Sequence, residues 1–183
     1  MELVKSFKQS KLIRYFFIAF IGSILLAISS KIKIPFYPVP MTMQTFIVLF
    51  IGIAFGWRLG VATISLYLFE GIIGLPVFSG TPEKGLGIVY FTGPTMGYLI
   101  GFIATVFIVG RFTYNDNLIK SFLKLTFATS FIYLFGILWL GFLIGWEKPI
   151  FKLGVQPFLL AELFKILIAT LALKQIKKLN KFI

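Results

Sequence analysis

The sequence reads Pro157-Phe-Leu-Leu-Ala-Glu-Leu-Phe-Lys-Ile-Leu-Ile-Ala-Thr-Leu-Ala-Leu173 near its end, an almost wholly apolar run with one carboxylate, Glu162, and one ammonium, Lys165. Residues three apart lie on one face of a helix, so these two charges can meet. A charged side chain in hydrocarbon costs about 2.5–3.5 kcal/mol on insertion scales. The pair should therefore face a protein interior or a wet cavity. It is either a functional site or a buried ion pair that ties two helices together.

The composition places this run in a membrane. Of 183 residues, 58% are hydrophobic and 13% are charged, whereas soluble domains carry about 25% charged residues. The chain has no Cys and no His, which excludes disulfides, zinc sites and His-based triads. No nucleophile and base are paired in the sequence, so we expect no catalytic residues, no metal and no cofactor. The positive-inside rule explains the net charge of +12 without a nucleic acid partner.

We predict an all-α polytopic membrane protein with residues 1–183 in a single domain. Apolar segments that could form six transmembrane helices cover residues 12–30, 42–57, 59–74, 94–110, 124–144 and 157–173. The second and third segments are short and meet at Gly56-Trp-Arg-Leu-Gly60. They could form one long bent helix, but Gly, Trp and Arg together favour a turn at the membrane interface.

The basic residues orient this bundle. With the N-terminus inside, twelve lie on the cytoplasmic side: Lys5, Lys8, Lys11, Arg14, Arg58, Arg111, Lys120, Lys124, Lys174, Lys177, Lys178 and Lys181. Five lie outside: Lys31, Lys33, Lys84, Lys148 and Lys152. This bias predicts two cytoplasmic termini in a multi-pass protein of the bacterial inner (plasma) membrane. Glu162, Lys165 and Glu70 then fall in the outer half of the bundle, which indicates an outward-facing cavity.

Two outer connections are patterned. Residues 31–44 hold Pro35, Pro38 and Pro40, and closely spaced prolines predict a stiff extended strap. The second connection, from Gly71 toward Tyr98, is long, apolar and rich in Gly. Such a loop is more typical of a lid or binding loop than of a simple linker, although it could merely pack over the bundle end.

Four motifs in these regions occur in a recognisable order. They read Pro38-Val-Pro-Met-Thr-Met-Gln44, Tyr67-Leu-Phe-Glu-Gly-Ile-Ile-Gly-Leu-Pro-Val-Phe78, Gly93-Pro-Thr-Met-Gly-Tyr-Leu99 and Gly154-Val-Gln-Pro-Phe158. Together they resemble the BioY family, the biotin-specific substrate-binding (S) components of energy-coupling factor (ECF) transporters. The resemblance covers about residues 15–173. It implies six membrane helices around an outer substrate cavity that loops cap.

The resemblance also implies site residues. The family typically has Gly-Asp followed by Lys three residues later, where this chain has Ala161, Glu162 and Lys165. Glu162 could accept from the ureido N–H groups of biotin, and Lys165 could pair with the ligand carboxylate or support the ureido carbonyl. Ser79 occupies a ligand-contacting region. Further candidates are Phe78, Tyr90 and Tyr98 as apolar walls, Gln44 as ligand contact or helix cap, and Glu70 as cavity residue or partner of Lys84 or Lys152.

The energy source must come from elsewhere, because the sequence contains no Gly-x-x-x-x-Gly-Lys-[Ser/Thr] motif for ATP. The family resemblance implies a membrane coupling (T) subunit and two ATPases as partners. Ala19, Ser23 and Ala27 form a small-residue stripe where family members dock to the coupling subunit. The main alternative is a stand-alone secondary, proton-coupled carrier with Glu162, Glu70 and Lys165 as a relay. An intramembrane enzyme and a purely structural subunit are weaker alternatives.

Overall fold

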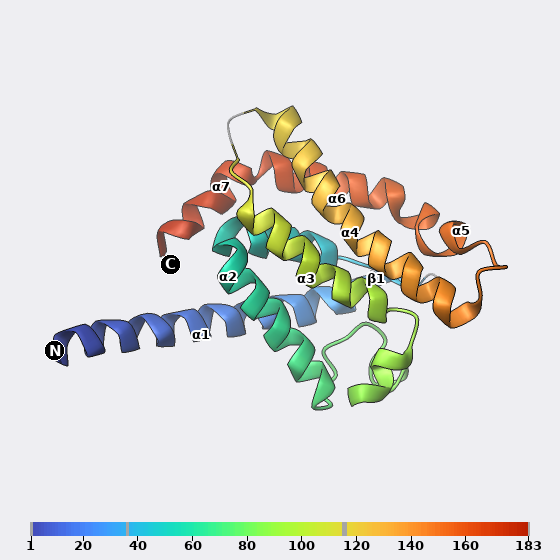
Figure 1. Ribbon diagram of the computed structural model, residues 1–183, viewed down its shortest axis with the longest axis horizontal. Helices are drawn as coiled ribbons and strands as arrows, with labels where there is room; N and C mark the ends of the chain where they lie inside the picture. The colour runs from blue at the N-terminus through green and yellow to red at the C-terminus, as the bar shows by residue number, and fades with distance from the viewer. Residues whose placement is uncertain (1, 36, 115–116, 183) are drawn as a thin grey trace.

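The computed structural model describes residues 2–35, 37–114 and 117–182, and these are mostly helical (Figure 1). The α-helices are α1 (Glu2–Lys31), α2 (Gln44–Ile72), α3 (Met96–Arg111), α4 (Leu118–Ile144), α5 (Ile150–Gly154), α6 (Leu159–Leu171) and α7 (Leu173–Lys178). Three 3-10 segments are η1 (Gly87–Thr92), η2 (Gln156–Phe158) and η3 (Leu179–Phe182). Two short strands, β1 (Lys33–Ile34) and β2 (Met41–Thr42), pair antiparallel, with Lys33 opposite Thr42. The segment predicted as a strap is non-helical at residues 32–35 and 37–43, as expected, but it folds back on itself so that its two ends pair, and Phe36 lies outside the described residues.

Helix α2 is a folded-back pair of arms. Its backbone leaves helical geometry at Gly56, with φ 72° and ψ 177°, a conformation that favours glycine. The Gln44 side chain donates to the hydroxyl of Tyr67 over 2.7 Å, although 23 residues of straight helix would span about 34 Å. The two arms thus run back along each other. The predicted junction at Gly56 is confirmed, as a break within one helix rather than a loop.

Within the described residues, four helical stretches are long and apolar enough to cross a membrane: Lys11–Lys31, Gln44–Ile72, Leu118–Ile144 and Ile150–Leu171. Helix α3 is apolar but only 16 residues long. The prediction of a helical, multi-pass architecture is confirmed at this level. The predicted segments at 42–57 and 59–74 lie together in α2, apart from residues 42–43 and 73–74 at their outer ends.

Helix α3 packs closely between α2 and α4 because glycines face its neighbours. A Cβ added at Gly101 would lie 2.5 Å from the Cα of Ile132 on α4. A Cβ added at Gly97 would collide with the Phe135 carbonyl, which also belongs to α4. Such small residues let helix backbones approach each other. They place the first turns of α3 beside the middle of α4, where pocket residues lie.

The two ends of the bundle differ. The start of α1 and the end of η3 lie at one end, whereas the β strands, η1 and α5 lie at the other (Figure 1). One buried cluster, which includes Tyr67, Phe78 and Tyr98, packs beneath the loops. A second, which includes Leu125 and Ile166, extends to α7. The candidate site is embedded in the first cluster.

The small-residue stripe of α1 faces into the protein. Ser23 is fully buried, Ala19 is 6% exposed and Ala27 packs against the first core cluster. The Ser23 hydroxyl donates to Glu70 Oε1 on α2 over 2.8 Å. The prediction that Ala19, Ser23 and Ala27 form a free docking face for a coupling subunit is therefore wrong for this fold. Small residues allow close approach to any helix, and here that helix is α2 of the same chain.

This burial changes what a bulky residue on α1 should do. Ser23→Trp is expected to destabilise the purified protein by at least about 1 kcal/mol, because the new ring has no space beside α2. The matched control is Ile21→Trp, since Ile21 is 55% exposed. Thermal unfolding in detergent measures both variants. Equal unfolding temperatures for Ser23→Trp and Ile21→Trp would contradict the packing described here.

Candidate functional site

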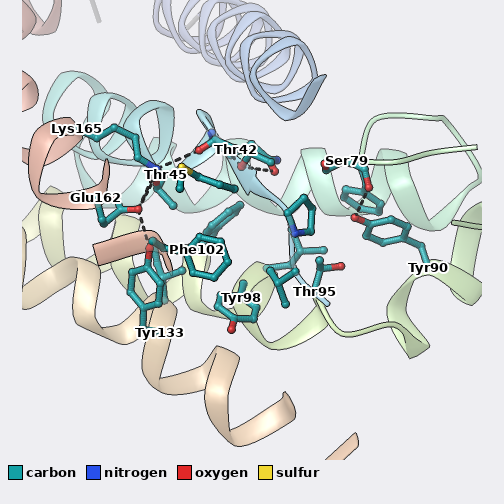
Figure 2. A pocket seen from close by; sticks show the side chains of 18 residues that line it. Thr42, Thr45, Ser79, Tyr90, Thr95, Tyr98, Phe102, Tyr133, Glu162 and Lys165 are labelled. Atoms are coloured by element: carbon teal, nitrogen blue, oxygen red, sulfur yellow. Dashed lines mark hydrogen bonds and ion pairs between the residues drawn. The ribbon is translucent and has the colours of Figure 1, made fainter. Parts of the chain in front are cut away.

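A pocket lies where the strap, the loop after α2 and the helices α3, α4 and α6 converge (Figure 2). Its lining combines polar groups at one end with an aromatic wall. The lining residues are Val39, Pro40, Met41, Thr42, Gln44, Thr45, Phe78, Ser79, Tyr90, Thr95, Tyr98, Leu99, Phe102, Ile132, Tyr133, Phe158, Glu162 and Lys165.

The predicted pair forms one polar end of this pocket. Lys165 Nζ lies 2.9 Å from Glu162 Oε2. Both residues are buried: Lys165 is 6% exposed and Glu162 is 4% exposed. The same ammonium donates to Thr45 Oγ1 over 2.5 Å and to the Thr42 carbonyl over 3.1 Å. Lysine has three N–H groups, so all three are engaged. The prediction that the two charges meet on one helix face is confirmed.

The carboxylate of Glu162 is satisfied on one side only. Its Oε2 accepts from Lys165, from Thr45 over 3.1 Å and from the Tyr133 hydroxyl over 2.8 Å. Its Oε1 is buried and has no hydrogen-bond partner among the described residues. Buried polar atoms are nearly always paired. Glu162 Oε1 is therefore an unusual, unpaired acceptor on a residue that lines the pocket.

A second unpaired polar atom lies on the opposite side of the pocket. Ser79 is 3% exposed, and its Oγ has no partner among the described residues. The backbone around it is fixed, because the Tyr90 hydroxyl donates to the Ser79 carbonyl over 2.8 Å. Burial raises the pKa of Tyr90, which keeps this phenol protonated as a donor. The pocket thus presents an anionic acceptor from α6 and a hydroxyl from the loop after α2 (Figure 2).

Aromatic rings form the wall between these polar ends. Phe78 and Tyr90 stack with ring centroids 4.7 Å apart, and Tyr133 and Phe158 pack 6.3 Å apart. Tyr98 meets Tyr133 edge to face at 6.2 Å, while its hydroxyl donates to the Gly154 carbonyl over 2.8 Å. Apolar cavities with a few placed polar groups are typical of small-molecule sites.

Two predicted residues have other surroundings. Gln44 lines the pocket, but its amide donates to Tyr67, and the N-cap position of α2 belongs to Met43. Glu70 is outside the pocket lining and accepts from Ser23 on α1. The assignment of Glu70 to the substrate site is therefore wrong. The structure shows no pairing of Glu70 with Lys84 or Lys152, both of which are described.

The sequence reading missed several pocket residues, notably Thr45, Thr95, Phe102 and Tyr133. Tyr133 carries a signal that could have been used, since a phenol inside the apolar run of α4 needs a hydrogen-bond partner. Thr45 follows Gln44 directly and faces α6. Its partner Lys165 lies 120 residues away, so only the fold brings them together.

Comparison with known protein families gives a match over residues 4–182 to the BioY family model. The chain belongs to the BioY family. The resemblance inferred from the four loop motifs is thereby confirmed.

Curated BioY proteins are similar over most of their length. The "Probable biotin transporter BioY" of Pyrococcus horikoshii is 36% identical over 141 residues, covering 77% of this chain and 82% of that protein. The "Biotin transporter BioY" of Thermotoga maritima is 32% identical over 157 residues, covering 85% and 91%. Family membership also makes this chain a transporter component rather than an enzyme.

A solved structure has the same fold. The crystal structure of an S-component for biotin from an ECF-type ABC transporter superposes with a TM-score of 0.76 over 92% of this chain and 93% of that chain. The sequences are 23% identical, so this likeness speaks to the fold. It fits the helical bundle with the pocket at its looped end.

Proposed function

We propose that this BioY chain binds biotin with high affinity as the substrate-binding component of an ECF-type uptake transporter. One observation carries the proposal: Glu162 Oε1 and Ser79 Oγ are buried and unpaired among the described residues, and both residues line one aromatic-walled pocket. A ureido ring offers two N–H donors and one carbonyl acceptor. The carboxylate oxygen suits the N–H groups, and a hydroxyl can serve either side of the ring.

The contacts of Lys165 support a different role from the two ligand contacts that the sequence predicted. Its three N–H groups are already engaged by Glu162, Thr45 and the Thr42 carbonyl. We therefore assign it to orienting the Glu162 carboxylate, rather than to binding the ligand carboxylate or the ureido carbonyl. The valerate carboxylate then needs another cation. Lys84 lines a neighbouring cavity that shares Tyr90 and Thr95 with the main pocket.

The Lys84 assignment predicts a chemical preference. The parent protein should bind biotin more tightly than biotinamide, and Lys84→Gln should remove that preference by weakening biotin binding about 3- to 5-fold, as expected of an exposed charge pair. Partial burial and the charge of Lys33 lower the pKa of Lys84. The preference for biotin over biotinamide should therefore fade as pH rises through this lowered pKa, because the Lys84 ammonium then loses its proton. Competition binding measures both ligands, and Lys148→Gln is the control. An unchanged preference in Lys84→Gln would refute the assignment.

We further propose a topology of six membrane spans, in which each arm of α2 and the shorter α3 count as one. The fold-back of α2 at Gly56 and the common position of both chain ends (Figure 1) support an even number of crossings. Most Lys and Arg residues lie at the end that holds both termini, which supports cytoplasmic termini in the bacterial plasma membrane. The pocket would then open to the outside.

Transport requires partners, which we propose to be a membrane coupling (T) subunit and two ATPases. The test is uptake of labelled biotin by cells that lack other biotin transporters, with and without these partner subunits. Accumulation should require functional ATPases, and an ATPase-dead module should reduce it to background. Equal uptake without any ATPase would refute the proposal and favour the stand-alone secondary carrier.

A further inference from the structure

We propose that Lys31, at the C-terminal end of α1, is a positioning residue that holds the segment Val77–Thr81 over the pocket and so sets how long a ligand stays bound. This segment carries Phe78 and Ser79, two lining residues of the pocket. The identity of the ligand rests on the proposed function. The holding role of Lys31 rests on the contacts alone.

All three N–H groups of the Lys31 ammonium are directed at this segment. They donate to the Phe78 carbonyl over 2.9 Å, to the Thr81 carbonyl over 3.2 Å and to Thr81 Oγ1 over 3.0 Å. Hydrogen bonds from a charged donor are about twice as strong as neutral ones. One side chain therefore bridges α1 to a loop 47 to 50 residues away in the sequence.

Neighbouring contacts fix the rest of the segment. The Val77 carbonyl accepts from Ser30 over 2.7 Å and from Tyr67 over 3.0 Å. The Ser79 carbonyl accepts from Tyr90.

With Lys31, these donors occupy the carbonyls of residues 77, 78, 79 and 81. The backbone of the segment therefore offers few groups to a ligand, while the Ser79 hydroxyl remains unpaired. The segment is organised to present one hydroxyl and one ring.

Two of the anchors, Ser30 and Lys31, come from α1, and Lys31 contributes three of the four hydrogen bonds from α1 to this segment. Both lie at the C-terminal end of α1, a long helix that packs mainly against α2. Tyr67 and Tyr90 belong to the core beneath the segment. Loss of Lys31 should therefore release Phe78 and Thr81 from α1, while Ser30 still holds the Val77 carbonyl and the buried supports remain.

The absence of native cysteines allows a direct test without any ligand. Ser79→Cys introduces one thiol at a site that is 3% exposed in the parent, so a maleimide can react only when the segment opens. Adding Lys31→Met should raise the labelling rate about 10-fold, and Lys31→Arg should restore most of the slow rate. The control is Lys33→Met, because Lys33 is exposed and its ammonium makes no hydrogen bond within the described residues. Labelling that stays as slow in Lys31→Met as in the control would overturn the proposal.

A second measurement uses the native Ser79. Labelled biotin is bound and then chased with unlabelled biotin; Lys31→Met should speed dissociation about 10-fold, whereas Lys33→Met should match the parent. Faster labelling with unchanged dissociation would overturn the role in ligand retention. If Lys31→Met does not fold, Lys31→Gln, which retains one amide donor group, replaces it with an expected rise of about 3-fold. A parent that binds no biotin refutes the proposed function, and the labelling rates still decide the role of Lys31.

Discussion

Glu162→Gln is expected to lower biotin affinity by about 100-fold, because a hydrogen bond to a charged group contributes about 1.5–3 kcal/mol and each 1.4 kcal/mol is tenfold. Three donors converge on Glu162 Oε2, so the oxygen of a Gln amide should stay there. Its NH2 group would then take the place of Oε1 and face the ureido N–H groups, donor against donor. Equilibrium binding of labelled biotin measures the loss. Glu147→Gln, at an exposed loop position, is the control.

This variant also removes the counter-charge of buried Lys165, which by itself is destabilising by about 3–5 kcal/mol. The double variant Glu162→Gln/Lys165→Met separates binding from folding. Replacing a whole buried pair is often neutral for stability, so the double variant should unfold at a higher temperature than the single one. It should still fail to bind biotin. Recovery of biotin binding in the double variant would show that Glu162 supports the fold and does not contact the ligand.

Gly101→Val is expected to destabilise the protein and to disrupt the packing of α3 against α4. The added Cβ would lie 2.5 Å from the Cα of Ile132 and 3.0 Å from the Phe131 carbonyl, and backbone atoms cannot move aside as a side chain can. Overpacking of this kind costs about 1–3 kcal/mol and occasionally more. Helices α3 and α4 would separate at the level of Phe102 and Tyr133, so the pocket should be lost with the packing.

The readouts are the thermal unfolding temperature and biotin binding of the purified variant. Ile100→Ala is the matched control, since the preceding residue on α3 is 38% exposed, and it should behave like the parent. A Gly101→Val protein that unfolds and binds like Ile100→Ala would contradict the close approach of α3 and α4.

Local patterns in the sequence predicted much of this arrangement. The spacing of Glu162 and Lys165 alone placed both charges on one face of α6, and an i, i+3 contact needs no other element. The break at Gly56 was likewise readable, because Gly, Trp and Arg interrupt an apolar run. Ser79 entered through the family resemblance, and no local signal singled it out.

The misassignments share a physical cause. A small-residue stripe permits close packing but does not specify the partner, so the sequence could not tell α2 from another subunit. Glu70 is a lone carboxylate in its helix, and its hydrogen-bond donor, Ser23, lies 47 residues earlier. The partners of Glu162 from α2 and α4 were missed for the same reason. Long-range pairs depend on how the helices assemble, which periodicity does not encode.

Equilibrium binding of labelled biotin to the purified chain in detergent, without partner subunits, tests the central claim most directly. The account predicts saturation at one biotin per chain with a dissociation constant below about 1 μM, a binding free energy stronger than about −8 kcal/mol. Excess thiamine or riboflavin should not displace the label. The absence of saturable biotin binding by the folded protein, or displacement of the label by either vitamin, would contradict it.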